Sequence, residues 1–198
     1  MKKIILTVAA VFAFGFANAQ EATSSEGGFA QGDLFVSGSV GFGSSKTGDE
    51  KMSGVVFAPA IGYFISENIA LGARLGVTST KEEEPGQEDF KTSGFEVEAF
   101  GRYYFTPASK FSVFGELAVG VGSSKSEQGN NEFKSQIFGI NAGVGVSYFL
   151  SNNWAIEAGW AGLGYNTDDN GGDGAEKTNS FGLNVDLSSI NFGLIYKF

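Results

Sequence analysis

The residues of this chain that could do chemistry are charged side chains set among glycine and alanine. They are Arg74, Glu96, Glu98, Arg102, Glu116 and Glu157. The chain contains no His and no Cys, so neither the most common catalytic base nor a thiol nucleophile is available. Glu96 and Glu98 lie two residues apart in one alternating stretch, a spacing that favours a hydrated interior over an acid/base pair. We therefore expect no enzyme activity and no cofactor.

The segments that must position these charges alternate between bulky apolar residues and small or polar ones, which is the period of a β-strand. Three short turns (66–68, 106–109 and 151–153) and four longer polar loops (44–53, 80–91, 123–132 and 167–179) separate them. The pattern predicts an all-β fold, an eight-stranded antiparallel up-and-down transmembrane β-barrel. The predicted strands are 33–43, 54–65, 69–79, 92–105, 110–122, 133–149, 154–166 and 180–198. In 154–166, alternation places Gly159, Ala161 and Tyr165 on the same face as Glu157.

The composition of the two strand faces indicates which solvent each face meets. The face that carries the charges is otherwise mostly Gly, Ala and Ser, which suits the narrow interior of an eight-stranded barrel. The bulky face is therefore predicted to point outward to lipid. A soluble lipocalin-like barrel is the alternative, but its water-facing surface would have no reason to be glycine-rich. Aromatic residues gather at the short-turn ends of the strands, as a membrane-interface belt would require: Tyr63, Phe105, Phe111, Tyr148, Trp154, Tyr196 and Phe198.

The N-terminus has the three parts of a secretory signal peptide. Lys2 and Lys3 precede an apolar run, and small residues follow it. We predict a signal peptide over 1–19, cleaved between Ala19 and Gln20, then a flexible leader over 20–32 and the barrel over 33–198.

Three phrases carry a resemblance to a known family: YFISENIALGARLG, YFLSNNWAIEAG and the ending INFGLIYKF. They look like the small outer-membrane β-barrel family common in Bacteroidetes, a porin-like family similar in architecture to the OmpA transmembrane domain and OmpX. The resemblance implies the outer membrane of a Gram-negative bacterium, with its lipid as a partner. It also implies the outer-membrane assembly machinery as a partner, recognising the C-terminal signal Ile190, Phe192, Leu194, Tyr196 and Phe198.

The last strand contains an irregularity. Its apolar residues are odd-numbered up to Leu187 and even-numbered from Ile190, so a β-bulge is predicted near Ser188 and Ser189. Closing the barrel requires this strand to pair with 33–43.

Two features leave functional alternatives open. The inward charges could form a structural plug of salt bridges or a gate across a narrow lumen. The acidic loops could be simply solvated, or Asp169 and Asp173 could form a weak Ca²⁺ site, although their spacing does not match an EF-hand.

The net charge of −9 argues against a nucleic-acid partner. We expect a monomer with a structural or surface-interaction role, such as membrane integrity or adhesion through the acidic loops to an extracellular partner. The alternative is a narrow porin-like channel for ions or small solutes.

Overall fold

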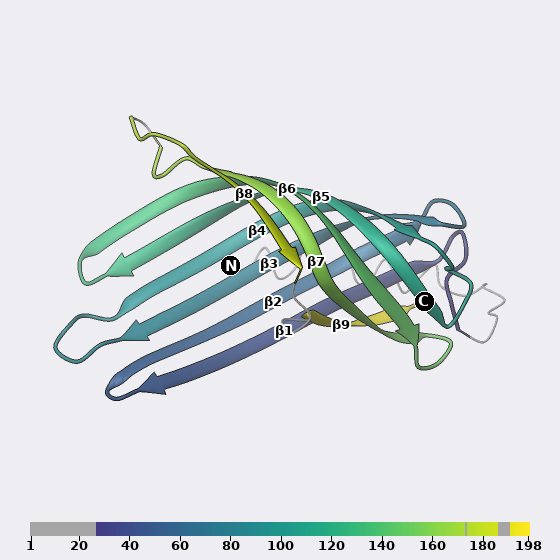
Figure 1. The fold of residues 1–198 in the computed structure, drawn as a ribbon, viewed down its shortest axis with the longest axis horizontal. Coiled ribbons are helices and arrows are strands. Elements are labelled where there is room, and N and C mark those ends of the chain that lie inside the picture. The colour runs from purple at the N-terminus through teal and green to yellow at the C-terminus, as the bar shows by residue number, and fades with distance from the viewer. Residues whose placement is uncertain (1–26, 173, 186–190) are drawn as a thin grey trace.

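The strands of the chain form one closed antiparallel barrel (Figure 1). The structure, a computed structural model, describes residues 27–172, 174–185 and 191–198. The predicted signal peptide and its cleavage site at Ala19 and Gln20 lie outside these residues. The strands are β1 Leu34–Thr47, β2 Glu50–Phe64, β3 Ile69–Glu83, β4 Phe90–Tyr104, β5 Phe111–Gln128, β6 Asn131–Phe149, β7 Trp154–Asp168, β8 Thr178–Val185 and β9 Asn191–Lys197.

The predicted fold class, an eight-stranded up-and-down barrel, is confirmed, with β8 and β9 together in the place of the eighth strand. Each strand pairs antiparallel with the next one along the chain from β1 to β7. The described residues contain no helix long and apolar enough to cross a membrane.

Strand alternation sorts the side chains into two environments. On β5, Leu117, Val119 and Val121 point outward and are 61%, 45% and 60% exposed, whereas Ala118 between them is buried. The bulky face is therefore the outer face, as predicted. The interior holds small residues and a few large ones that fill it.

The barrel closes through β9. Residues 35–38 of β1 pair with β9, from Phe35 opposite Lys197 to Gly38 opposite Leu194. On its other edge β9 pairs with the first half of β7, and β8 pairs with the second half. The predicted pairing of the last strand with 33–43 is confirmed over these four residues. The predicted bulge at Ser188 and Ser189 lies outside the described residues.

The predicted facing of β7 is wrong in its second half. The register between β6 and β7 shifts between Val144 and Gly145, so that Gly145 faces Gly159 but Val144 faces Ala161. This extra residue exchanges the two faces of β7, and Tyr165, predicted to point inward with Glu157, is 43% exposed on the outside. The Gly- and Ala-rich sequence around the bulge hid it, because small residues fit either face.

Two of the four predicted long loops, 44–53 and 123–132, are mostly strand, and 80–91 is strand at both of its ends. The β1–β2 ladder continues to Thr47 opposite Glu50, and the β5–β6 ladder to Gln128 opposite Asn131. Beyond the apolar band both faces of a hairpin are polar, so the period-2 signal disappears while the backbone hydrogen bonds continue. Figure 1 shows these hairpins projecting from one end of the barrel, with the short turns at the other. We call these the long-hairpin end and the short-turn end.

Large inward side chains lie across glycines of neighbouring strands. A Cβ added to Gly72 would lie 2.3 Å from Cζ of Phe100, and one added to Gly120 would lie 2.7 Å from Cγ of Glu98. Since backbone and side chain already touch there, only glycine fits, and this close approach accounts for much of the glycine in the interior.

We expect Gly72→Ala to lower the free energy of unfolding by about 1–3 kcal/mol, the usual result of overpacking. The matched control is Gly115→Ala, where a new Cβ meets nothing within 4 Å. Urea unfolding of the refolded protein in lipid vesicles measures both. Equal stability of the two variants would contradict this account of the interior glycines.

Candidate functional site

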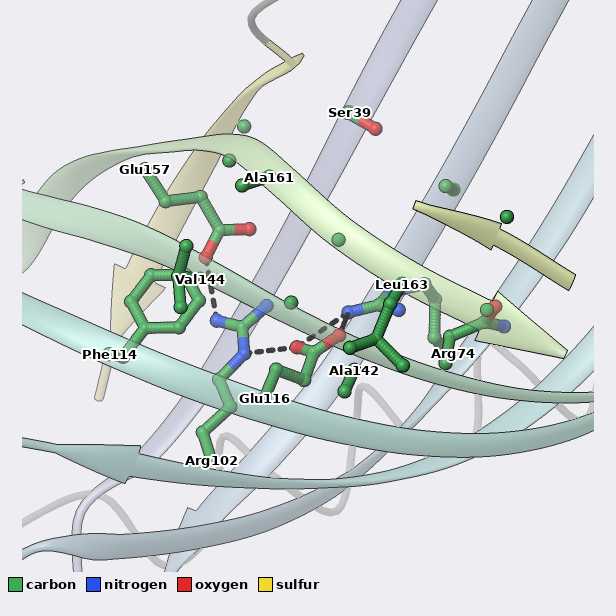
Figure 2. A pocket seen from close by; sticks show the side chains of 18 of the residues that line it. Ser39, Arg74, Arg102, Phe114, Glu116, Ala142, Val144, Glu157, Ala161 and Leu163 are labelled. Atoms are coloured by element: carbon green, nitrogen blue, oxygen red, sulfur yellow. Dashed lines mark hydrogen bonds and ion pairs between the residues drawn. The ribbon is translucent and has the colours of Figure 1, made fainter. Parts of the chain in front are cut away.

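Five of the six predicted inward charges meet inside the barrel. Figure 2 labels four of them, Arg74, Arg102, Glu116 and Glu157. Arg74 comes from β3, Glu98 and Arg102 from β4, Glu116 from β5 and Glu157 from β7. Arg74 lies directly opposite Glu98, and Arg102 directly opposite Glu116. Alternation sends all five side chains to the inner face, so the strand register alone places opposite charges next to each other. We call these five residues the lumen cluster.

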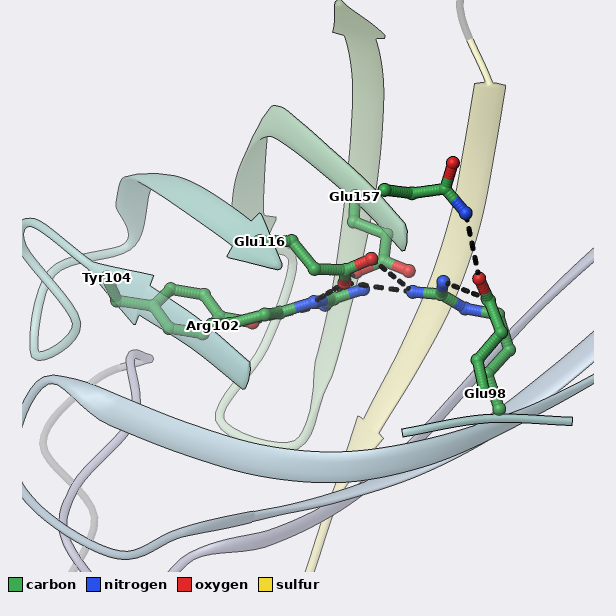
Figure 3. Close-up of polar contacts among 7 residues, drawn as sticks. Glu98, Arg102, Tyr104, Glu116 and Glu157 are labelled. Carbon is green, nitrogen blue, oxygen red and sulfur yellow. Dashed lines mark hydrogen bonds and ion pairs between the residues drawn. The ribbon is translucent and has the colours of Figure 1, made fainter. Parts of the chain in front are cut away.

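Arg102 is the centre of the lumen cluster (Figure 3). Its Nε lies 2.5 Å from Oε2 of Glu116, and its Nη1 lies 2.6 Å from Oε2 of Glu157. Nη1 also donates to the Tyr104 hydroxyl at 3.3 Å. The side chain is only 4% exposed, so these partners replace the water that a guanidinium otherwise binds.

Glu116 joins the two arginines. Nη2 of Arg74 lies 2.8 Å from each carboxylate oxygen of Glu116, one of which also accepts from Arg102. Nη1 of Arg74 lies 2.8 Å from Glu98, and the Asn141 amide donates to the other oxygen of Glu98 at 3.4 Å. The network therefore runs continuously from β7 through β4 and β5 to β3 and β6.

Aromatic rings flank both arginines. Cζ of Arg102 lies 4.5 Å from the centroid of the Phe114 ring and 5.0 Å from that of Phe100. Cζ of Arg74 lies 5.1 Å from the Phe100 centroid. These cation–π contacts fill the space beside the guanidinium planes and exclude water from it.

Glu96, the sixth predicted charge, stands apart from the lumen cluster. It is half-buried on the same face of β4, and within the described part of the chain no hydrogen bond or ion pair reaches it. Glycines lie opposite it on both neighbouring strands, Gly76 on β3 and Gly122 on β5.

A cavity of about 710 Å³ lies beside the lumen cluster (Figure 2). Arg74, Arg102 and Glu116 line part of it, and glycines such as Gly143 and Gly162 line the wall formed by β6 and β7. The volume exists because this side of the barrel carries glycines where β3 to β5 carry long side chains. Both guanidinium groups in its lining are already paired with carboxylates, so they stabilise the barrel more readily than they would bind an anion.

The carboxylate of Asp169, half of the weak Ca²⁺ candidate, is engaged in its own loop. Its Oδ1 accepts backbone N–H groups of Gln136 at 2.7 Å and Gly171 at 3.2 Å. Asp173 lies outside the described residues. Across the residues that the structure describes, no three or more acidic side chains are grouped to hold a metal ion.

The tip of the β5–β6 hairpin carries exposed ion pairs. Lys125 lies 2.8 Å from Glu132 and 2.5 Å from Glu127, and Lys134 lies 2.5 Å from Glu132. The hydrogen bond from Lys125, followed by the one from Lys134, lowers the pKa of Glu132 from 4.5 to about 2.

The C-terminal signal residues lie on the outer face. Phe192 and Leu194 are exposed there, and Ile190 lies outside the described residues. The Tyr196 ring contacts the rings of Trp154 and Phe198 edge-on, with centroids 4.9 and 5.0 Å apart. These three aromatics form part of the predicted belt at the short-turn end.

Sequence reasoning missed a second cluster at the short-turn end. Phe29, in the predicted flexible leader, is only 2% exposed, and Lys197 lies 3.4 Å from Asp33. The position of Lys197 between outward Tyr196 and Phe198 could have shown that it points inward. The sequence carries no signal for Phe29, because its partners are distant in the chain.

Comparison with known proteins identifies the family. The family described as "Outer membrane protein beta-barrel domain" matches residues 6–198. The chain belongs to this family. Its location is therefore the outer membrane of Gram-negative bacteria, which excludes the alternative of a soluble barrel.

Solved outer-membrane barrels share the fold. The N-terminal β-barrel domain of OprF from Pseudomonas aeruginosa is 12% identical, with 86% of this chain and 100% of that chain covered and a TM-score of 0.50. OprG from Pseudomonas aeruginosa is 17% identical, with 86% and 98% covered and a TM-score of 0.53. No curated protein matches the chain.

We expect Arg102→Met to lower the free energy of unfolding of this outer-membrane barrel by about 3–5 kcal/mol, because Glu116 and Glu157 lose their shared partner inside the lumen. Lys134→Met is the control, since it removes an exposed ion pair and should change stability little. Denaturant unfolding in lipid vesicles compares them. An Arg102→Met protein as stable as the control would show that the lumen cluster is not a structural plug.

The lowered pKa of Glu132 predicts a pH dependence of the hairpin tip. A carboxylate whose pKa falls on folding stabilises the folded state at pH above its unfolded value, here 4.5. That contribution is lost as the pH falls through about 2. We expect the ¹³C signal of the Glu132 carboxylate to titrate near pH 2, and Lys125→Gln to move the midpoint upward. A midpoint that Lys125→Gln does not move would contradict the assigned cause.

Proposed function

We propose that this chain is a non-enzymatic outer-membrane barrel with a closed lumen and a structural or surface-interaction role. The observation that carries the proposal is the lumen cluster, which crosses the interior from β3 to β7 with hydrogen-bonded ion pairs. An ion entering the lumen would have to separate charges that are already compensated. The cluster therefore favours the plug over the gate.

The long-hairpin end supports the surface role. Polar ladders extend beyond the apolar band on β1 to β6, and near their tips they carry exposed acidic residues such as Glu50 and Glu82. Rigid hairpins present such charges at fixed positions, which suits contact with an extracellular partner better than a flexible loop does.

Further properties belong to the same proposal. The sequence pattern is the basis for three of them: cleavage after Ala19, recognition of the outward C-terminal aromatics by the assembly machinery, and action as a monomer. The phrases YFISENIALGARLG and YFLSNNWAIEAG support a Bacteroidetes-type, OmpX-like subgroup. The proposal includes no cofactor and no nucleic-acid partner.

A narrow channel is the second candidate, and the cavity of about 710 Å³ favours it. The two candidates differ in whether the remaining lumen conducts. The glycine-lined side leaves space, but the lumen cluster crosses the half of the barrel nearer the short turns.

Planar-bilayer recording separates the two candidates. We expect the folded protein, verified by its heat-modifiable mobility on gels, to give no steady unitary openings. Glu116→Gln and Glu127→Gln form a matched pair, because the first alters the lumen and the second a hairpin tip. Openings of the unaltered protein whose size changes with Glu116→Gln but not with Glu127→Gln would establish conduction through the lumen and overturn the closed barrel.

A further inference from the structure

The segment Gly27–Asp33 crosses the barrel mouth at the short-turn end. The backbone N–H of Phe29 donates to the carbonyl of Pro107 at 2.7 Å, in the turn between β4 and β5. The N–H of Gly32 donates to the carbonyl of Phe64 at 2.9 Å, at the end of β2. These two bonds attach the segment to two separate points of the rim.

Phe29 fills the mouth beneath this segment. Its ring centroid lies between 4.6 and 5.5 Å from the centroids of Phe64, Phe149, Tyr104 and Phe35. All five rings are at most 2% exposed. Tyr104 in turn accepts a hydrogen bond from Arg102, so the ring cluster lies directly against the lumen cluster.

Lys197 holds the segment from the last strand. Its Nζ donates to the carbonyl of Gly28 at 2.6 Å and lies 3.4 Å from Asp33. Asp33 also accepts the N–H of Ala30 at 2.8 Å. Lys197 is 5% exposed. A buried ammonium needs polar partners, and the segment supplies them through the Gly28 carbonyl and the Asp33 carboxylate.

The backbone at Gly28 admits only glycine. Its φ is +103°, and an added Cβ would lie 2.5 Å from the carbonyl carbon of Ala108. At Gly28 the segment therefore packs directly against the β4–β5 turn, and a methyl group added there should push it away from the turn.

We propose that Gly27–Asp33 is a stopper that shuts the short-turn mouth, and that Lys197 makes its insertion conditional on barrel closure. Lys197 lies opposite Phe35 in the β1–β9 pairing. Its ammonium can therefore reach Gly28 only when the last strand has joined the first. The stopper locks the closed barrel, and this does not depend on whether the long hairpins bind a partner.

Chymotrypsin cleavage after Phe29 reports whether the stopper is inserted. The refolded protein is digested, and the fragment that begins at Ala30 is quantified by mass spectrometry. The full chain in its folded state should be cut slowly there. Lys197→Met should raise the rate about tenfold or more, as loss of a charge-assisted hydrogen bond implies. Gly28→Ala should raise it similarly without touching the last strand. In both variants the barrel should keep its heat-modifiable folded band.

Two control variants isolate the contacts. Lys46→Met removes a lysine from the β1–β2 hairpin, and Gly32→Ala adds a methyl at a positive φ with nothing within 4 Å. Cleavage after Phe29 should be slower in Lys46→Met than in Lys197→Met. It should likewise be slower in Gly32→Ala than in Gly28→Ala. Cleavage of the unaltered folded chain as fast as in urea would overturn the stopper, and so would protection that persists in both Lys197→Met and Gly28→Ala.

A refolding time course tests the conditional step. Protection of the bond after Phe29 should appear together with the folded band or after it. Protection that precedes the folded band would show that the stopper inserts before closure and would overturn the role assigned to Lys197.

Discussion

A guanidinium group held almost entirely away from water sets the strongest constraint on this barrel. Arg102 is 4% exposed, and its charge is compensated by Glu116 from the neighbouring strand and Glu157 from across the lumen. Such a group is tolerated only while every partner stays in place. The register of β4, β5 and β7 must therefore be kept together, and strands that share no backbone hydrogen bonds are coupled through the interior.

Glycine makes this arrangement possible. The interior of an eight-stranded barrel is only wide enough for side chains to fill it, so a long side chain must lie over a residue that has none. Phe100 over Gly72 and Glu98 over Gly120 show the pattern. Where glycines face one another without a long partner, on β6 and β7, a cavity remains. The close packing of long side chains over glycines and the cavity beside β6 and β7 thus both result from the high glycine content of the interior.

The two ends of the barrel are built differently. The short-turn end is filled by aromatic rings around Phe29, while the long-hairpin end continues as polar ladders with exposed ion pairs such as Lys125 with Glu132. A barrel with one filled end and one extended polar end fits the proposed surface role. This asymmetry supports a surface role more strongly than fold similarity does, because barrels of one fold serve many functions.

The sequence by itself determined the strand number, the outward apolar face and the inward position of five charges that meet, because period-2 alternation depends only on local order. It could not determine the bulge that turns Tyr165 outward, since small residues fit both faces, nor the hairpin ladders, whose two faces are both polar. Only the tertiary structure decided that Glu96 stands apart from the lumen cluster. It also decided that Phe29 fills the short-turn mouth and that Lys197 of β9 contacts the segment Gly27–Asp33. Those contacts join residues far apart in the chain, and closure of the barrel brings them together.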